Sequence, residues 1–293
     1  MKLITIDNFQ TPSYTYLISH AHNDHIKGYR RYKNGIILGS HITIEVLKLY
    51  MDKVLDIFVK KLSVENEYDI VNGRCNIKLR AFDANHCPGA LMFCFKTPNK
   101  NILYTGDFRL DKRIEEIAKE CCGIDIAYID TTYSNEFYSF ISQESAIIEI
   151  LDIIKKNCGK KIYIGLYSLG KNKIIKAIFE HLRLKIYVDA FNANIFKIIG
   201  LEKTIATAHQ NNIIYGVDLR TLWRKMETKQ EEPNSIYIIP TGRVQSNRVV
   251  RNVFYLVPYS EHCDYHELRR FISILRPKEF YPLHYFKGLE YII

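Results

Sequence analysis

Four potential metal ligands stand within six residues near the start of the chain, in the segment SHAHNDH at residues 19–25. His20 and His22 are two residues apart, so on an extended chain their side chains share a face. Asp24 and His25 follow where the chain turns toward a helix. Imidazole nitrogens and carboxylate oxygens suit Zn²⁺, Mn²⁺ or iron. Because histidine is a rare residue, this density indicates a metal-binding loop.

Two further segments supply groups of the same kind, each after a predicted strand. His86 lies in DANHCPGA at residues 83–90, before a Pro-Gly turn, and Asp107 lies in YTGDFR at residues 104–109. Ligands on loops at strand ends are held by a rigid scaffold while they face solvent. These two residues add to the first segment a further imidazole and a carboxylate that can bridge two ions.

Short apolar runs, rich in β-branched and aromatic residues, predict the strands that position these segments. Strands are expected at 3–6, 15–19, 35–38, 77–81, 91–95, 102–104, 126–129, 235–239 and 253–257. Helices are expected at 42–51, 142–156, 171–182 and 265–275, and a polar linker at 227–234. Strands dominate the first ~130 residues, and the alternation of strands and helices that follows is typical of an α/β insertion.

Composition narrows the class of protein. The chain has 293 residues and a formal net charge of +9, which favours a polyanionic partner. No run of about 18 apolar residues is present, and the N-terminus lacks the apolar stretch of a signal peptide, so we expect an intracellular protein.

The cysteines are the other informative part of the composition. Seven cysteines occur without a CxxC pair, which argues against a zinc ribbon or a thioredoxin site. We expect most of them to be buried thiols in a reducing compartment.

The order of HAHNDH, a lone histidine and TGD resembles the signature of the metallo-β-lactamase fold. Further segments are more specific: DANHCPGALMF, ILYTGDFR, YIDTTY, LYSLGKNK and VPYSEHCDYHELRRFISILRPK. They resemble the β-CASP branch of that fold, the nucleases that include Artemis and the DNA crosslink-repair 5′ exonucleases. The resemblance extends from Ile6 to about Pro282 and so covers nearly the whole chain.

The resemblance implies an α/β protein with a four-layer αββα metallo-β-lactamase fold and an inserted β-CASP α/β domain. Residues 1–133 and 234–293 are expected to form the two parts of the metallo-β-lactamase domain. Residues 134–233 are expected to form the β-CASP domain.

The resemblance also implies roles for individual residues. The expected metal ligands are His20, His22, Asp24, His25, His86, Asp107 and His262. One ion would be held by His20, His22, His86 and Asp107, and a second by Asp24, His25, Asp107 and His262. The residues expected to act in catalysis are Asp24, Asp107 and His262. Asp7 and Asp130 would fix the imidazoles from behind. The expected cofactor is Zn²⁺, as one or two ions, with Mg²⁺ or Mn²⁺ as alternatives at the second site.

A predicted anion site follows the strand that ends at Leu166, where a Ser-Leu-Gly turn leads into a helix. The free N–H groups at such a helix start, with a lysine beside them, favour a phosphate. By the resemblance, Ser168, Gly170 and Lys171 would hold the 5′ phosphate of the substrate. Tyr215 stands where the family's middle β-CASP motif usually carries a histidine, and His209 aligns poorly with that position.

The implied function is metal-dependent 5′→3′ exonucleolytic hydrolysis of DNA from 5′-phosphorylated ends, in the repair of interstrand crosslinks or other damage. Three alternatives stay open: an Artemis-like structure-selective endonuclease, a β-CASP RNA-processing nuclease, and an inactive nucleic-acid-binding scaffold. The expected partner is single- or double-stranded DNA with a 5′ phosphate. We expect a nuclear monomer that does not bind membranes.

Overall fold

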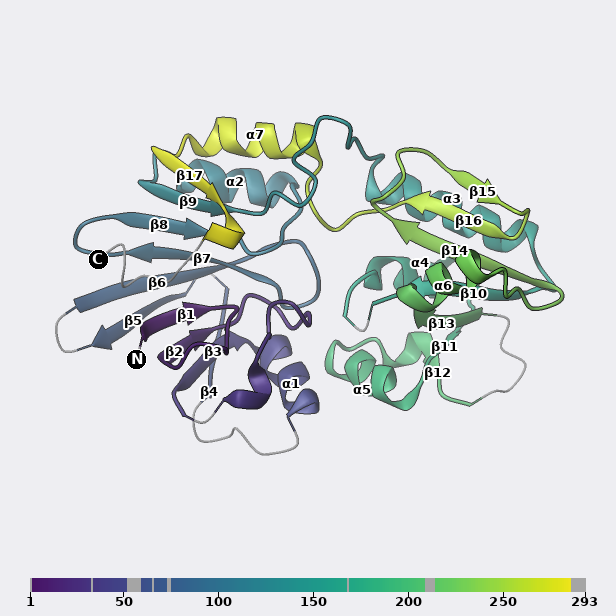
Figure 1. Cartoon of the computed structure of the whole chain (residues 1–293), viewed down its shortest axis with the longest axis horizontal. Coiled ribbons are helices and arrows are strands. Elements are labelled where there is room, and N and C mark those ends of the chain that lie inside the picture. Colours follow the sequence, from purple (N-terminus) through teal and green to yellow (C-terminus); the bar gives the residue numbers. More distant parts are fainter. Residues whose placement is uncertain are drawn as a thin grey trace. The chain divides into compact units, whose positions relative to one another are not determined.

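The computed structural model describes residues 2–32, 34–51, 59–64, 66–72, 75–167, 169–208 and 214–285. The chain forms two compact units (Figure 1). The first contains Met1–Glu136 and His262–Ile293, and the second contains Phe137–Glu261.

The first unit contains two β-sheets. The smaller sheet is parallel, has the order β1-β2-β3-β4, and consists of β1 (Lys2–Ile6), β2 (Ser13–Leu17), β3 (Ile36–Ser40) and β4 (Val59–Leu62). The larger sheet has the order β17-β9-β8-β7-β6-β5. Its strands are β5 (Glu67–Asn72), β6 (Cys75–Asp83), β7 (Leu91–Lys96), β8 (Asn101–Tyr104), β9 (Ile126–Ile129) and β17 (Glu279–Pro282). One apolar core joins the sheets, with Leu17 and Leu38 from the smaller sheet and Leu79 and Phe93 from the larger.

Helices cover the outer faces of the two sheets. Helix α1 (His41–Tyr50) packs Ile44 and Leu47 against Ile18 and Ile37 beside the smaller sheet. Helices α2 (Lys112–Glu120) and α7 (Tyr265–Leu275) pack against each other on the far side of the larger sheet (Figure 1). Short 3₁₀ turns lie at Tyr29–Arg31 and Leu283–Tyr285. The layers are therefore helix, sheet, sheet and helices, which confirms the predicted αββα fold.

The second unit has one seven-stranded sheet in the order β12-β11-β13-β10-β14-β16-β15. Its strands are β10 (Lys161–Leu166), β11 (Ile186–Tyr187), β12 (Ile205–Ala206), β13 (Ile214–Asp218), β14 (Ser235–Thr241), β15 (Arg248–Val250) and β16 (Phe254–Pro258). Only β15 pairs antiparallel with its neighbour among these described strands. Its helices are α3 (Gln143–Lys156), α4 (Asn172–Leu182), α5 (Ala190–Ile198) and α6 (Leu219–Thr228), with a 3₁₀ turn at Glu202–Thr204.

Successive strand residues enter two different cores in the second unit. Ile162 and Ile164 pack with α3 and α4, whereas Tyr163 packs with α6. This alternation is expected of a strand with both faces covered, because successive side chains point to opposite faces. Trp223 on α6 joins the second of these cores.

The second unit extends to residue 261, whereas the sequence predicts a return to the first domain at residue 234. Strand β14 pairs with β10 from Lys161↔Ser235 to Ile164↔Ile238, and β16 pairs with β14. Residues 235–258 therefore complete the sheet of the second unit. The sequence predicts these strands correctly, but an apolar run does not specify which sheet it joins. The description of residues 134–233 as a β-CASP domain stays a prediction.

Most predicted elements are confirmed, but three helices, α2, α5 and α6, were not predicted. Helix α2 was not predicted, because its sequence KRIEEIAKE buries only Ile114 and Ala118. The predicted linker at 227–234 begins inside the last turn of α6. None of the helices in the described ranges is long and apolar enough to cross a membrane.

A pair of isoleucine substitutions tests the packing of the second unit. Ile164 is fully buried, whereas Ile148 on α3 is 59% exposed. We expect Ile164→Ala to lower the free energy of unfolding of this unit by about 2–5 kcal/mol through lost burial and a cavity. Ile148→Ala should change it by less than about 0.5 kcal/mol. Native-state hydrogen exchange of the β10 amides measures both, and equal protection in the two variants would contradict the assigned core.

Candidate metal centre

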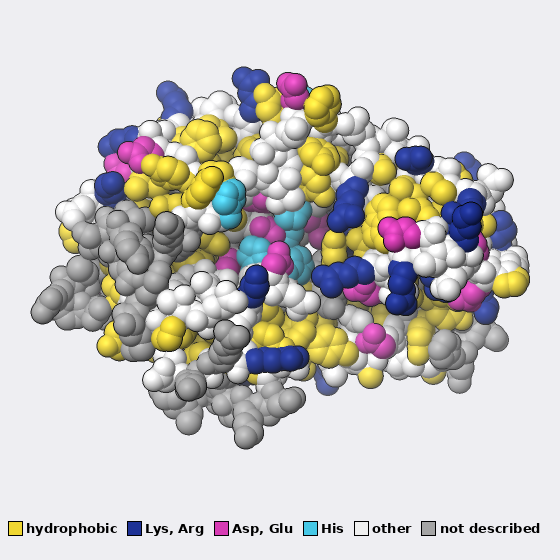
Figure 2. All heavy atoms as spheres, in the orientation of Figure 1, with side chains coloured by type: hydrophobic (Ala, Val, Ile, Leu, Met, Phe, Trp, Pro, Cys, Tyr) yellow, Lys and Arg dark blue, Asp and Glu magenta, His cyan; other side chains and the backbone are white. Residues whose placement is uncertain are grey.

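Loops from several strands meet at one edge of the first unit. In the larger sheet, Phe93 of β7 pairs with Tyr104 of β8, and β8 runs parallel to β9. The start of β7 and the ends of β8 and β9 therefore lie at the same edge. The loop after β2 is joined to it because Leu91 N–H donates to Ser19 C=O at 2.9 Å. Histidine (cyan) and acidic (magenta) side chains gather together on the face seen in Figure 2.

The ring nitrogens of four histidines converge on one carboxylate oxygen. Oδ2 of Asp107 lies 3.3 Å from Nε2 of His25, 3.7 Å from Nε2 of His20 and of His86, and 4.0 Å from Nε2 of His262. These residues lie in four separate loops of the first unit. Such convergence of imidazoles around a buried carboxylate is the arrangement that a metal centre requires.

A second group surrounds His22. Its Nδ1 lies 2.9 Å from Nε2 of His20 and 3.3 Å from Nε2 of His86. A sulfur atom joins this group, because the ligand atoms of these three histidines and Cys87 all lie within 4.8 Å of one another. Nitrogen and thiolate donors at such spacing fit a zinc-like ion. The residues of the centre therefore fit the metal that their fold family implies.

Asp7 supports the loop that carries the first three histidines. Its Oδ2 lies 2.8 Å from Nδ1 of His25 and accepts hydrogen bonds from Ser19 Oγ at 2.6 Å and Tyr104 Oη at 2.9 Å. Ser19 Oγ also lies 3.0 Å from Nδ1 of His20. Partners on the far side of an imidazole fix its orientation and its tautomer. The structure thus places Asp7 behind two of the predicted ligands.

Asp130 has the same relation to His262. Its Oδ2 lies 2.7 Å from Nδ1 of His262, which leaves Nε2 facing Asp107. Its other oxygen accepts hydrogen bonds from the N–H and the hydroxyl of Thr132, at 2.9 and 2.6 Å. The roles of Asp7 and Asp130 toward a bound metal stay predictions, but both carboxylates contact the expected imidazoles.

Two residues of the centre are in the forms that bind a metal, whereas His25 is not. Burial lowers the pKa of His20 well below its usual range, and repulsion from His25 and His22 adds to this effect, so His20 is neutral. Burial alone would raise the pKa of Asp107, but His25 and His262 lower it well below its usual range. A neutral imidazole and an ionised carboxylate are the forms that bind a metal.

His25 is in the form that does not bind a metal. Burial alone would lower its pKa, but Asp7 and Asp107 raise it well above its usual range. Its imidazole must therefore lose a proton before it can bind a metal.

Asp24 lies at the margin of the centre. Its side chain is 81% exposed, and its Oδ2 lies 3.8 Å from Nε2 of His25. It is outside the described groups whose ligand atoms all lie within 4.8 Å of one another. An exposed carboxylate in this position has access to water as well as to the histidines.

A glycine permits the close approach of two loops. Gly106 precedes Asp107 and has a φ of 55°, in the left-handed region that favours glycine. A Cβ at this position would lie 3.0 Å from the Cβ of Ser19 and 3.2 Å from the carbonyl oxygen of Leu91. The TGD segment therefore needs glycine for both its backbone conformation and its packing.

The predicted phosphate-binding residues are arranged differently from the expectation. Lys171 is 4% exposed, and its ammonium donates to the carbonyl oxygen of Pro240 at 2.7 Å. Its backbone N–H, at the start of α4, donates to Oε1 of Glu261 at 2.7 Å. Gly170 N–H donates to the side chain of Asn172, and Ser168 lies outside the described residues. The helix start thus binds a carboxylate supplied by the chain itself.

Tyr215 belongs to a row of aromatic side chains that crosses the sheet of the second unit. It is half-buried, stacks on Tyr163 with ring centroids 5.3 Å apart and meets Tyr187 edge to face at 5.7 Å. The row continues to Tyr237 and Phe254, which also stack. Strand register produces it, because these residues are paired across β11, β13, β10, β14 and β16. Tyr215 belongs to the second unit, whereas the histidines of the centre belong to the first.

Sequence reasoning missed several residues of the centre. Cys87 directly follows His86, but it was interpreted as a buried apolar residue. Ser19 precedes His20, and its hydroxyl connects this histidine to Asp7. Arg109 is buried and pairs with Glu267 at 3.2 Å, next to the loop of His262. Cys87 and Ser19 could have been predicted from the sequence, because each is next to a predicted ligand.

Comparisons with known proteins agree with this geometry. The sequence pattern of the family described as DNA repair metallo-beta-lactamase matches residues 206–283. The chain is 30% identical to the human DNA cross-link repair 1A protein, over 95% of this chain and 29% of that protein. It is 30% identical to the DNA cross-link repair protein SNM1 of Arabidopsis thaliana, over 91% of this chain and 60% of that protein.

One further relative and one solved structure extend the comparison. The 5′ exonuclease Apollo of Danio rerio is 28% identical, over 92% of this chain and 48% of that protein. The chain therefore spans 60% or less of each of these three relatives. A crystal structure of a protein of unknown function from Enterococcus faecalis V583 matches with a TM-score of 0.64 at 15% identity, over 93% of this chain and 75% of that one. This last match concerns the fold alone.

Loss of Asp7 should weaken metal binding without removing a ligand. In Asp7→Ala, the rings of His25 and His20 lose their fixed orientation, so we expect the affinity for Zn²⁺ to fall by about 10–100-fold. Competition with a chromophoric chelator measures this affinity. His41→Ala, which changes an exposed histidine of the same unit, should bind Zn²⁺ as the parent does. Equal affinity in Asp7→Ala and the parent would show that Asp7 does not support the centre.

Burial of Lys171 should make the stability of the second unit rise with pH. Burial lowers the pKa of its ammonium to about 8, from the ordinary 10.5. The folded chain therefore binds fewer protons than the unfolded chain between these values, and folding becomes more favourable as pH rises. We expect the parent to gain roughly 2–3 kcal/mol relative to Lys171→Met between pH 7 and 10. Urea titrations of both proteins measure this difference, and parallel pH profiles would contradict it.

Proposed function

The chain belongs to the metallo-β-lactamase family of DNA-repair proteins that includes the Artemis and SNM1 nucleases, and on that premise we propose that it is a metal-dependent DNA nuclease. Its reaction is the hydrolysis of phosphodiester bonds, 5′→3′ from 5′-phosphorylated ends, in the repair of interstrand crosslinks or other DNA damage. The observation that carries the proposal is the convergence of four imidazoles on Oδ2 of Asp107.

The proposed cofactor is Zn²⁺, as one or two ions, with Mg²⁺ or Mn²⁺ as alternatives at the second site. The first ion would be held by His20, His22, His86 and Asp107, and the second by Asp24, His25, Asp107 and His262. Bound metal supplies Lewis acidity toward a phosphoryl oxygen and lowers the pKa of the attacking water. Asp107 contributes to both groups because its Oδ2 lies within 4.0 Å of all the Nε2 atoms around it.

The residues of the chain have distinct proposed roles. Asp24 is exposed beside His25, and its carboxylate would orient the attacking water and accept its proton. His262 is held through Nδ1 by Asp130, so its Nε2 is directed at the reacting region. Asp7 and Asp130 act as positioning residues, since they contact imidazoles rather than substrate.

We propose that the start of α4 binds the phosphate at the 5′ end of the substrate strand. Support comes from the N–H of Lys171, which already donates to an anionic oxygen of Glu261. A phosphate would compete with that carboxylate for the helix start, where backbone N–H groups favour anions. We further propose that the substrate is single- or double-stranded DNA and that the protein acts as a monomer in the nucleus. Relatives named for DNA cross-link repair and 5′ exonuclease activity support DNA as the substrate.

End-labelled oligonucleotides test the activity directly. Single-stranded DNA and RNA, each with and without a 5′ phosphate, are incubated with the full chain with and without a chelator. We expect successive shortening of 5′-phosphorylated DNA from its 5′ end, faster than of the 5′-hydroxyl form, abolished by chelation and restored by Zn²⁺.

A pair of variants tests whether the activity depends on the metal centre. Asp107→Ala should lose more than the roughly 100-fold typical of an outer-shell partner, because it removes a ligand. His41→Ala should keep the parent rate. A single internal cut would instead favour the endonuclease, cleavage of RNA alone would favour RNA processing, and no cleavage with any metal would favour the scaffold.

A further inference from the structure

A second group of reactive side chains lies on the outer face of the larger sheet, away from the metal centre. Cys94 on β7 is paired with Arg80 on β6, and Lys96 is paired with Lys78. Directly opposed residues of neighbouring strands share a face. The intervening residues Leu79 and Phe95 belong to the core between the sheets, so Cys94 and Arg80 point to the other side.

The end of α2 brings a second thiol to the same place. Arg80 forms an ion pair with Glu120, the last residue of α2, and Cys121 caps that helix. The backbone of Cys121 is held on both sides, since its N–H donates to Ile117 C=O at 2.9 Å and its C=O accepts from Ile124 N–H at 3.2 Å. Cys94 and Cys121 line the same pocket.

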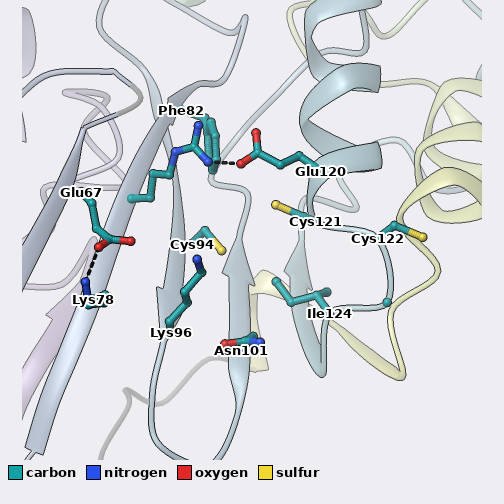
Figure 3. A pocket seen from close by; sticks show the side chains of 12 residues that line it. Glu67, Lys78, Phe82, Cys94, Lys96, Asn101, Glu120, Cys121, Cys122 and Ile124 are labelled. Atoms are coloured by element: carbon teal, nitrogen blue, oxygen red, sulfur yellow. Dashed lines mark hydrogen bonds and ion pairs between the residues drawn. The ribbon is translucent and has the colours of Figure 1, made fainter.

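Figure 3 shows the two sulfur atoms pointing toward each other across this pocket, whereas the sulfur of Cys122 points away. The pocket has a volume of about 170 Å³, several times the roughly 30 Å³ that one water molecule occupies in the liquid. A small oxidant therefore has room to reach Cys94, which is only partly buried.

The surroundings give the two thiols different reactivity. Interaction with the Cys121 thiol lowers the pKa of Cys94, and the positive charges of Lys96 and Arg80 lower it further. The same interaction, together with burial, raises the pKa of Cys121. The thiolate is the nucleophilic form of cysteine. Because Cys94 is paired with Arg80 and shares a strand face with Lys96, we assign the attack to Cys94 and the resolving step to Cys121.

We propose that Cys94 and Cys121 form an oxidisable dithiol that a peroxide converts into a disulfide. The sulfur of Cys94 attacks one peroxide oxygen, the O–O bond breaks, and the products are a sulfenic acid at Cys94 and one molecule of water. The sulfur of Cys121 then attacks the sulfur of Cys94, the S–O bond breaks, and a second water leaves with the thiol proton. The two thiols lose two electrons in total, and the peroxide gains them.

The disulfide would connect the last part of β7 to the end of α2. It would close the chain segment from residue 94 to residue 121, which contains β8 and Asp107 but leaves every histidine of the metal centre outside the closed loop. Neither thiol is among the expected metal ligands, and the disulfide can be tested without any nuclease assay.

The test uses the full chain treated with hydrogen peroxide, followed by alkylation of the remaining thiols and mass spectrometry. We expect the loss of two hydrogen atoms, two fewer alkylated cysteines, and a tryptic peptide 81–96 linked to peptide 120–155 through Cys94 and Cys121. Dithiothreitol should restore both thiols. The absence of this link, at a peroxide dose that oxidises the exposed Cys122, would overturn the proposal.

Serine variants test whether the disulfide forms with Cys121 or with the adjacent Cys122. Cys94→Ser and Cys121→Ser should each abolish the linked peptide, whereas Cys122→Ser should form it at the parent rate. A link that depends on Cys122 rather than Cys121 would overturn the assignment. Because the linked peptide is also mapped by fragmentation in the parent chain, the result does not depend on whether a variant folds.

Discussion

A carboxylate that is removed from water must be compensated by hydrogen bonds or by positive charge, because its desolvation costs several kcal/mol. Asp107 is 9% exposed, and His25 supplies this compensation, because its pKa is raised well above the usual range and its Nε2 lies 3.3 Å from Oδ2 of Asp107. The rings of His20, His86 and His262 complete the group around this carboxylate. These rings come from loops after β2, after β6 and before α7. The folding of the first unit therefore depends on bringing these loops to one carboxylate, and the same constraint that stabilises Asp107 assembles a set of metal ligands.

The imidazoles around Asp107 are themselves held by a second set of carboxylates. Asp7 and Asp130 each bind the far nitrogen of an imidazole, and each is in turn held by hydroxyl and backbone donors. Asp7 follows β1 and Asp130 follows β9, so both sheets contribute to this set. Because the supporting carboxylates are attached to strand ends, the orientation of the rings is tied to the packing between the sheets. A metal can then bind to donors whose positions are already fixed.

The sequence predicts the parts of this structure that depend on local spacing. The cluster at residues 19–25 is such a part, because four ligands within six residues need no knowledge of the fold. Contacts between distant segments are harder to predict: the link from Asp130 to His262 spans 132 residues and was available only through the family resemblance. The sequence also predicts the strands within residues 235–258, but not the sheet that they join. A strand buried on both faces has the same apolar pattern whichever sheet it belongs to. The direction of the Lys171 ammonium was also missed, because a lysine at a helix start is usually solvated, whereas here two tyrosine rings and a carbonyl surround it.

The aromatic row of the second unit has an optical consequence. Tyr163 and Tyr237 belong to the same apolar cluster as Trp223, which is the only tryptophan of the chain. Light absorbed by these tyrosines can therefore pass to a single nearby indole, and its emission reports on one unit alone. The first unit has tyrosines but no tryptophan, so it contributes no indole signal. Tryptophan fluorescence thus follows the second unit selectively in the intact chain.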